Sequence, residues 1–407
     1  MMQKVGCDSD QLVFNKIKSL SWNDLLFFSL VSVFATVPLG PALKNVSLVL
    51  LMFFWLASGV FWTERYRWLR QDWFLPLLCM VLLPWVGLLW STDIQTGLGY
   101  AQRSVYWLYG LAAASILYQK YTAKNLILAF LAGLFVAAQV SVLQMMGFIS
   151  MYQGTMYGFL NHISYSLLLV AGLLFLAYQF REQTNRSIRF GIVAGILLLM
   201  LNLGIGASRA GYLAFVFAVP WMLVVMFPRR QLVLIFFCGL LAVGALAMSP
   251  VVHTRVAEMK SNIVSYHQGE GLTSIGLRFH MWDGALKIWK AHPWLGVGTG
   301  GYRQAFSAVA EDPRYVIYSH PHNSLLHIAV SYGIVGVSVF IWLVVVVLRR
   351  GWMARRTPAG QIILVFLFVI GVGSLTDTQI MGHATGVLLG IISGLPANPT
   401  EMDDQAR

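Results

Sequence analysis

Long apolar runs recur along this chain, and they limit its fold more than any other feature of the sequence. A helix of about 20 apolar residues crosses the roughly 30 Å of hydrocarbon in a bilayer. Of the 407 residues, 58% are hydrophobic and 11% are charged, whereas about a quarter are charged in soluble domains. We therefore predict an all-α polytopic membrane protein with about twelve transmembrane helices. The predicted spans are 24–40, 45–62, 74–90, 103–118, 125–147, 160–178, 188–206, 210–227, 231–249, 323–348, 361–377 and 382–395.

Lys and Arg gather in alternate loops between these runs, and this pattern predicts how the chain is oriented. Basic residues in short loops favour the cytoplasmic side. The basic loops contain Lys4, Lys16 and Lys18; Arg65, Arg67 and Arg70; Lys120 and Lys124; Arg181, Arg186 and Arg189; Arg229 and Arg230; and Arg349, Arg350, Arg355 and Arg356. Both termini are accordingly predicted to be cytoplasmic. The formal charge of +12 is then a topology signal, and no nucleic acid is expected as a partner.

The same pattern divides the chain into four parts. Residues 1–249 are predicted to hold the first nine spans, 250–320 a large exterior loop domain, 321–395 the last three spans, and 396–407 a cytoplasmic tail. The cytoplasmic loops are short, and the chain contains no Gly-x-x-x-x-Gly-Lys-Ser/Thr phosphate loop. We therefore expect no nucleotide cofactor.

One stretch of the exterior loop, residues 277–291, has helical periodicity and contains no proline. At 100° per residue, one stripe of this stretch holds Arg278, Trp282, Ala285 and Trp289. We predict an interfacial amphipathic helix with its tryptophans at headgroup depth. Arg278 is out of place on this stripe, because a buried guanidinium needs an anionic partner. Snorkelling, a salt bridge to Asp377 or an anionic ligand would each satisfy it.

A histidine motif closes the exterior loop. All nine histidines lie on the predicted exterior side or at exterior ends of spans, and His320 and His322 bracket Pro321 just before Asn323 and a new apolar run. The dipole at the start of the next helix disfavours imidazolium, so we predict that His322 is neutral and acts as a general base. His320 and Asn323 are secondary candidates.

Two other ligand sites in this region are less favoured. A metal site would use His320 and His322 with His327 or His383, but the neighbouring loop offers no compact carboxylate or cysteine cluster to complete it. We therefore predict that no metal is bound. The glycines at 296–301 are expected to form a turn, with an anion-binding nest as the alternative.

Three arginines at the predicted exterior boundary have few acidic residues near them in the sequence. They are Arg103, Arg209 and Arg278. A guanidinium binds phosphate oxygens through two parallel hydrogen bonds, so a lipid-linked phosphate or pyrophosphate is the expected ligand; each arginine alone is also typical of a headgroup anchor. Asn161 and His162 open another span from the exterior, and they are candidates for contact with a sugar hydroxyl.

Three motifs together resemble the bacterial O-antigen ligase and O-antigen polymerase superfamily. They are Ser-Arg-Ala-Gly-Tyr at 208–212, the segment from Arg278 to Trp282 that runs into His-Pro-Trp-Leu-Gly-Val-Gly-Thr-Gly at 292–300, and His-Pro-His-Asn-Ser-Leu-Leu-His at 320–327 followed by Tyr-Gly-Ile-Val-Gly at 332–336. The resemblance is clearest from about 200 to 345, while the flanking spans agree only in number and hydropathy. Within the superfamily, twelve spans and one large exterior loop look most like the O-antigen ligase.

The resemblance implies a multi-pass enzyme of the bacterial inner membrane with a periplasmic active site. Such a ligase moves O-antigen glycan from undecaprenyl pyrophosphate to the lipid A-core, without a nucleotide or a metal. Carried onto this sequence, the motif histidine is His322 and the motif arginines are Arg209 and Arg278, with Arg103 as a further assignment. A single base without an enzyme nucleophile predicts direct displacement with inversion at the anomeric carbon.

Two alternatives stay open. The O-antigen polymerase, or a protein O-oligosaccharyltransferase of the same superfamily, would differ only in its acceptor. A transporter of lipid-linked sugars would hold phosphate with the same arginines, but transporters usually bind substrate near the bilayer midplane and often contain inverted repeats. The ionisable residues of this chain gather at one predicted face instead, so we favour a transferase.

Overall fold

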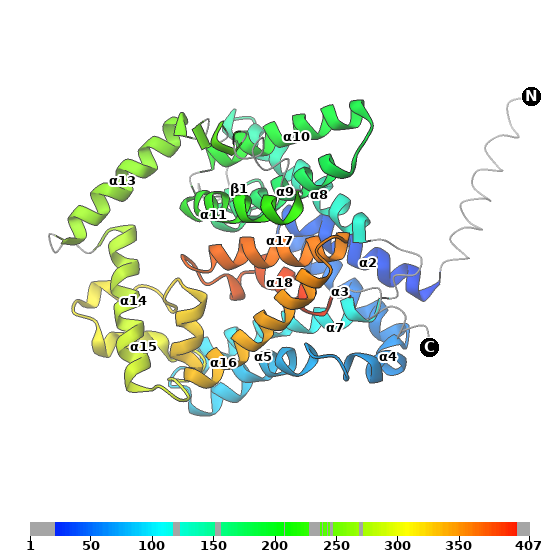
Figure 1. Cartoon of the computed structure of the whole chain (residues 1–407). Helices are drawn as coiled ribbons and strands as arrows, with labels where there is room; N and C mark the ends of the chain where they lie inside the picture. Colours follow the sequence, from blue (N-terminus) through cyan, green and yellow to red (C-terminus); the bar gives the residue numbers. More distant parts are fainter. Residues whose placement is uncertain are drawn as a thin grey trace, which may run out of the picture.

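The described chain is almost entirely helical (Figure 1). The computed structural model describes residues 21–116, 123–150, 156–206, 208–227, 237, 239–241, 243–244, 247–267 and 272–396. The elements before residue 183 are α2 (Trp22–Thr36), η1 (Val37–Leu39), α3 (Pro41–Ala57), α4 (Val60–Trp68), α5 (Phe74–Val86), η2 (Gly87–Trp90), α6 (Ile94–Arg103), η3 (Ser104–Leu108), α7 (Tyr109–Ala114), α8 (Ala123–Met145), β1 (Met156–Tyr157), β2 (Leu160–Asn161) and α9 (His162–Glu182). The later elements are α10 (Arg186–Ile205), α11 (Arg209–Met226), α13 (Pro250–His267), α14 (Ser274–Ala291), α15 (Tyr302–Val309), η5 (Pro313–Tyr315), α16 (Ser324–Met353), α17 (Pro358–Gly373), η6 (Gln379–Met381) and α18 (Thr385–Gly394).

Six of these helices are long and apolar enough to cross a bilayer, which is the architecture of a polytopic helical membrane protein. They are α2 with η1, α8, α9, α10, α11 and α16. A seventh span is possible if α3 and α4, which meet at 90°, count as one. The apolar helix α17 has 16 residues, so it is only about 24 Å long. By length and composition, the described residues therefore hold six or seven candidate spans, and the count of twelve is not confirmed.

Two predicted spans differ from the structure in particular ways. The predicted span 103–118 is not one helix, because α6 ends at Arg103 and is followed by the 3-10 turn η3 and the short helix α7. Most of the predicted span 231–249 lies outside the described residues. The predicted loop at 250–320 also contains the helix α13 over Pro250–His267, where only a polar loop was expected.

Helix α9 forms the centre of the bundle. It packs against α8, α10, α11 and α17, and nearly all of its side chains are buried. Phe175 of α9 meets Phe130 of α8 and Phe366 of α17, with ring centroids 5.2 to 5.6 Å apart and the rings close to perpendicular. Such edge-to-face contacts are favoured between aromatic rings. The loop after α17 lies near the N-terminal ends of α9 and α11, since Thr376 lines one cavity with His162 and Arg209.

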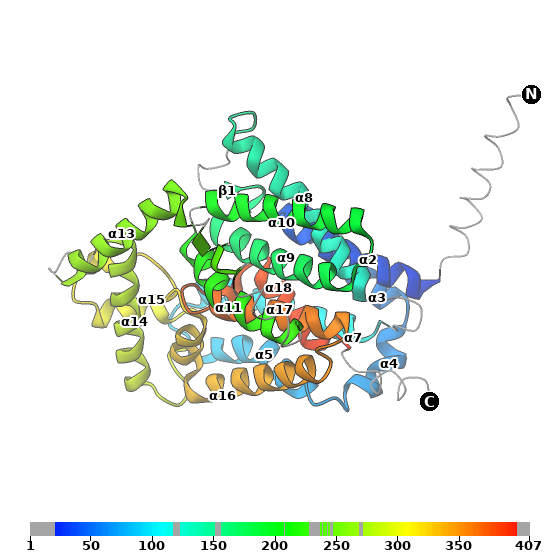
Figure 2. The same ribbon diagram turned by 45° about the horizontal axis from the view of Figure 1, so that its top comes forward.

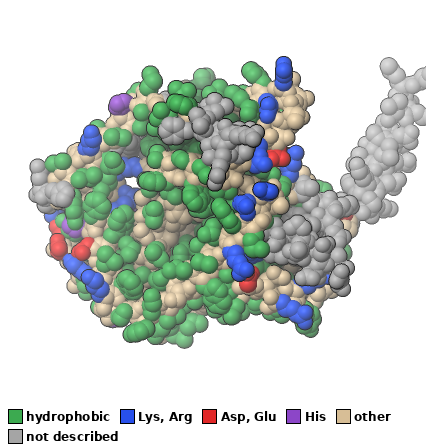
Figure 3. All heavy atoms as spheres, viewed as in Figure 1, with side chains coloured by type: hydrophobic (Ala, Val, Ile, Leu, Met, Phe, Trp, Pro, Cys, Tyr) green, Lys and Arg blue, Asp and Glu red, His purple; other side chains and the backbone are tan. Residues whose placement is uncertain are grey.

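Helices α13, α14 and α15 lie together beyond one end of the bundle, and α4 lies at the other end (Figures 1 and 2). On the face drawn in Figure 3, hydrophobic side chains cover most of the bundle between the two ends. The basic residues Arg65 and Arg67 belong to α4. The segment with α13, α14 and α15 is thus separated from this basic helix by the length of the bundle.

Polar caps set the start of the helices that carry the candidate residues. Asn161 caps α9, Ser208 caps α11, Thr273 caps α14 and Asn323 caps α16, each with its side-chain oxygen accepting a backbone N–H. Such caps satisfy the free N–H groups at a helix start. Two candidate residues, Asn161 and Asn323, therefore have structural roles in the described fold.

Helix α14 confirms that the stretch 277–291 is helical, but its packed face differs from the predicted stripe. The fully buried side chains are Leu277, Met281, Ala285 and Ile288, and they pack with α15 and α16. Arg278, Trp282 and Trp289 are only half-buried at the edge of this face. The predicted stripe is rotated by about one residue from the buried face. The helix packs against α15 and α16, and the apolar side chains that fit this protein surface determine its rotation.

The glycine-rich segment 296–301 crosses α16 where that helix is broken. Gly333 has φ 62° and ψ −154°, which interrupts the hydrogen bonding of α16. The N–H groups of Val297 and Gly298 donate to the free carbonyls of Val330 and Ser331, at 2.8 and 3.0 Å. The predicted turn is confirmed, and because protein carbonyls accept these N–H groups, they do not form the anion-binding nest that was the alternative.

Replacing Gly296 by alanine should lower the melting temperature of the purified protein. Gly296 has φ +63°, and an added Cβ would lie 2.2 Å from the Val330 carbonyl oxygen, so the backbone must shift at a cost of about 1–3 kcal/mol. Gly99 of α6 is the matched control, because a Cβ there meets nothing within 4 Å. Thermal unfolding in detergent checks this, and equal melting temperatures for the two variants would contradict it.

Candidate functional site

Two loops that are far apart in the sequence meet at the N-terminal end of α16. The Ser324 N–H donates to the Ser374 carbonyl at 3.0 Å, and the Asn323 Nδ2 donates to the Leu375 carbonyl at 3.1 Å. These bonds hold the segment before α16 against the segment after α17. They bring Asp377 next to the histidine motif.

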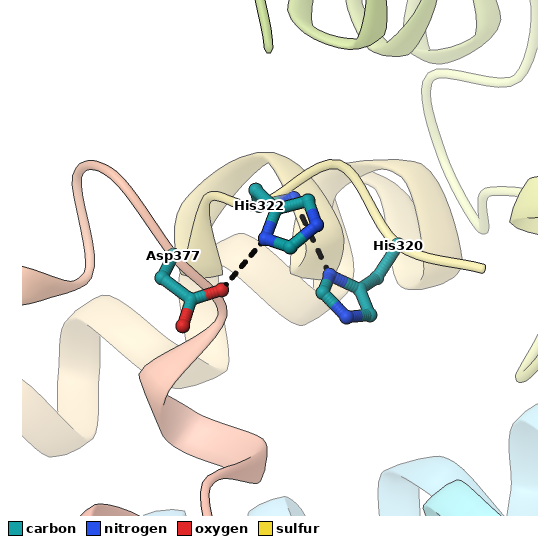
Figure 4. Close-up of side chains that lie close together, drawn as sticks. All are labelled: His320, His322 and Asp377. Atoms are coloured by element: carbon teal, nitrogen blue, oxygen red, sulfur yellow. Dashed lines mark hydrogen bonds and ion pairs between the residues drawn. The ribbon is translucent and has the colours of Figure 1, made fainter. Parts of the chain in front are cut away.

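His322 and Asp377 form a hydrogen-bonded pair at this junction (Figure 4). His322 Nδ1 lies 2.8 Å from Asp377 Oδ1, and the two side chains are 15% and 21% exposed. Burial alone would raise the pKa of Asp377, but its hydrogen bonds, above all the one with His322, outweigh burial and lower that pKa. When Nδ1 carries the proton of this hydrogen bond and Asp377 accepts it, Nε2 presents its lone pair. This arrangement suits a general base.

The backbone of His322 is held in an unusual conformation. Its φ is 49°, the one positive φ among the described non-glycine residues, and such strain persists only where surrounding contacts impose it. The ring contacts those of Tyr318 and His320, with centroids 4.6 and 4.4 Å away. Trp282 Nε1 donates to the Pro321 carbonyl at 3.0 Å. These ring contacts and the Trp282 hydrogen bond thus fix the orientation of His322.

His320 supports this turn. Its Nδ1 accepts the His322 backbone N–H at 3.4 Å and lies 3.1 Å from the Thr378 hydroxyl. Burial, with the nearby His322, lowers the pKa of His320 to about 4. His320 is therefore neutral at physiological pH, and it positions the loop that holds His322.

A cavity of about 570 Å³ contains both Arg209 and Arg278. Arg209 begins α11 and Arg278 lies in the second turn of α14. Both guanidinium groups donate to the Ser274 hydroxyl, at 3.3 Å from Arg209 Nη1 and 3.0 Å from Arg278 Nη1. Figure 3 shows an opening beside basic side chains between α13 and the bundle. The two arginines therefore converge from different helices, as expected for binding of one anion.

The charges in this cavity are unevenly balanced. Arg209 Nη2 lies 3.3 Å from the Glu258 carboxylate of α13. Arg278 donates to the Thr376 carbonyl at 3.2 Å and to the Ser274 carbonyl at 2.9 Å, and no described carboxylate forms an ion pair with it. Burial lowers the pKa of Arg278, and Arg209 adds to this effect while Asp377 opposes it. A half-buried guanidinium without a carboxylate partner favours an anionic ligand.

The cavity adjoins the histidine pair. Trp282 lines the cavity and also bonds the backbone of the histidine turn. Thr376, another lining residue, directly precedes Asp377. An anion held by the arginines would therefore lie next to the proposed base.

The structure places the other candidates differently. His162 lines the arginine cavity. Arg103 lines a separate cavity of about 40 Å³ with Tyr100 and His327, and its guanidinium lies 5.8 Å from the centre of the Tyr100 ring. Arg103 therefore does not share the cavity of Arg209 and Arg278, although it acts electrostatically on His320.

The structure does not place His327 or His383, the further ligands of the alternative metal site, in one cluster with His320 and His322. His327 is buried against Tyr100, and His383 Nδ1 bonds the Tyr106 hydroxyl at 2.8 Å. Instead, ligand atoms of His320, His322 and Asp377 lie within 4.8 Å of one another. Asp377 was considered in the sequence analysis only as a partner for Arg278. Its position just after the apolar run of α17 was the signal that marked it as a candidate in its own right.

Comparison with known proteins gives two findings. Residues 192–341 match the family model described as O-Antigen ligase. An uncharacterised protein of Haemophilus influenzae (strain KW20/Rd) is 28% identical over 216 residues, which are 50% of this chain and 52% of that protein. The chain thus spans about half the length of the curated relative that it matches. The family segment contains Arg209, Arg278 and His322 and ends before Asp377.

Proposed function

Because this chain belongs to the O-antigen ligase and polymerase superfamily, we propose that it is an O-antigen ligase of the bacterial inner membrane. It would transfer O-antigen glycan from undecaprenyl pyrophosphate to the lipid A-core at the periplasmic face. The observation that carries the proposal is the cavity in which Arg209 and Arg278 converge beside the His322–Asp377 pair. The proposal includes both termini in the cytoplasm and twelve spans.

In the proposed mechanism the arginines bind the donor. Arg209 and Arg278 hold the pyrophosphate, which displaces the Glu258 carboxylate from Arg209. As the bond between the anomeric carbon and the phosphate oxygen breaks, negative charge grows on the leaving undecaprenyl pyrophosphate. Two guanidinium groups fixed in a half-buried cavity stabilise that charge without having to reorganise.

The histidine pair acts on the acceptor. His322 Nε2 removes the proton of the acceptor hydroxyl as its oxygen attacks the anomeric carbon from the side opposite the leaving group. Asp377 holds the proton that Nδ1 already carries, and it stabilises the imidazolium that forms when Nε2 takes the acceptor proton. One displacement inverts the anomeric configuration, and it requires neither a nucleotide nor a metal.

The proposed function is tested by supplying the purified full chain with undecaprenyl-pyrophosphate-linked glycan and lipid A-core. Ligation to the core without added nucleotide is expected, and the lipid A-core is then exchanged for a second glycan or a protein acceptor. Elongation of the glycan would identify a polymerase, and glycosylation of the protein would identify a protein O-oligosaccharyltransferase. Movement of the donor across the vesicle membrane, without transfer of its glycan to any acceptor, would identify a transporter and contradict the proposal.

Replacing Asp377 by asparagine should lower kcat by on the order of 10²-fold or more while leaving donor binding nearly unchanged. The amide nitrogen can donate to Nδ1, which would put the ring proton on Nε2 and remove the lone pair that the mechanism needs. Steady-state kinetics with varied donor measures this effect. Asp312→Asn is the control, because Asp312 lies in the same exterior segment and bonds Arg314. A rise in the donor KM with unchanged kcat would assign Asp377 to donor binding.

A further inference from the structure

The cluster of His320, His322 and Asp377 has a chemical property beyond its proposed catalytic role. Its three ligand atoms lie within 4.8 Å of one another, on two loops that are partly open to solvent (Figure 4). Two imidazoles and one carboxylate are a donor set that binds Zn²⁺ with a further position open for water. The carboxylate that is lacking near the motif in the sequence thus comes from 55 residues further on.

Neighbouring groups would orient these ligands. Gln379 Nε2 donates to Asp377 Oδ2 at 3.0 Å, and the Thr378 hydroxyl lies 3.1 Å from His320 Nδ1. Such outer contacts fix ring and carboxylate orientation in metal sites. The charges of Arg278, which acts on Asp377, and of Arg103, which acts on His320, oppose cation binding, so a reversible site is expected and not a permanent structural one.

We propose that this cluster binds Zn²⁺ reversibly, and that the bound ion inhibits the transfer reaction. Zn²⁺ bonds to ligand atoms at about 2.0–2.2 Å, so it would insert between His322 Nδ1 and Asp377 Oδ1, now 2.8 Å apart, with His320 moving toward them. A neutral imidazole bound through Nδ1 carries its one hydrogen on Nε2. The lone pair that removes the acceptor proton is then absent, and Asp377 is no longer free to stabilise an imidazolium. The inhibitory effect rests on the proposed function, whereas the metal site does not.

The site is tested first by binding alone. The full chain, purified in detergent without a polyhistidine tag, is titrated with ZnCl₂ against a chromophoric zinc chelator. We expect one zinc ion to bind per chain. His320→Gln removes a ligand, and it should weaken zinc binding at least about tenfold, because even the loss of a contact outside the ligand shell has that effect in metal sites. His292→Gln is the matched control, because His292 is exposed in the same exterior segment. No zinc binding, or equal binding by the wild type and His320→Gln, would overturn the site.

The effect on transfer is tested second. At a free Zn²⁺ concentration about ten times the Kd, the transfer rate should fall about tenfold, and EDTA should restore it. Each variant is compared with its own metal-free rate, and inhibition of His320→Gln should require at least about tenfold more zinc. If zinc binds through His320 and does not slow transfer, both the proposed inhibition and the role of His322 as base are overturned. If the metal-free wild type transfers no glycan, the proposed function is contradicted instead.

Discussion

Replacing His322 by alanine should lower the rate of glycan transfer by about 10²–10⁴-fold, the usual contribution of a positioned general base. The variant loses the only imidazole of the motif that the structure pairs with a carboxylate, Asp377. The donor should still bind, because Arg209 and Arg278 are unchanged. The measurement is the single-turnover rate with saturating donor and lipid A-core, together with the affinity for undecaprenyl pyrophosphate measured as product inhibition.

His292→Ala is the control for this experiment, since that exposed histidine lies outside the cavity and the motif. Near-normal ligation by His322→Ala would remove the assignment of the base. The configuration of the product gives a second and independent check. Retention at the anomeric carbon would contradict a single displacement, whichever residue removes the proton.

Replacing Arg278 by alanine should lower kcat/KM by about 10²–10³-fold, because the variant loses a fixed positive charge that stabilises the leaving pyrophosphate. Arg278 is half-buried and has no described carboxylate partner, so its charge is available to the pyrophosphate. Arg209→Ala should have a smaller effect, since Glu258 already neutralises part of its charge. Steady-state kinetics with varied donor measures both losses.

Lysine substitutions separate charge from geometry at these two positions. Lysine keeps the charge but not the planar fork of donors, so Arg278→Lys should recover only part of the lost activity. The double variant should lose less than the sum of the two single losses in free energy, because both guanidinium groups share Ser274 and one proposed ligand. Arg314→Ala, which removes an exposed arginine bonded to Asp312, is the control. Strictly additive losses would contradict a shared ligand.

The sequence predicted well those features that depend on neighbouring residues. Long apolar helices, the helix around Arg278 and the turn at 296–301 all follow from local hydropathy, periodicity or glycine content, and the structure confirms each of them. Single long spans were less predictable. The run 103–118 is apolar enough to cross a bilayer, yet it is divided between η3 and α7, because packing against neighbouring helices also satisfies short apolar elements.

The candidate site was predictable in part for the same reason. Arg209, Arg278 and His322 stood out because charged and polar groups are costly at a membrane boundary, and the structure brings the two arginines into one cavity beside the histidine. Arg103 met the same criterion and lies in another cavity. Asn161 and Asn323 were polar at the right depth, but they cap helices. Burial cost identifies a residue that needs a partner, and it does not say which partner it has.

By itself, the sequence determined the helical membrane class and the set of polar residues that require an explanation. The length of an apolar run and the charge of a loop depend only on consecutive residues, so both can be predicted directly from the sequence. Only the tertiary structure decided that Asp377 is the partner of His322, and that Ser274 joins the two arginines. Those contacts depend on how α16, α17, α11 and α14 pack together. The free energy of that packing comes from many apolar contacts, none of which lies in the motifs themselves.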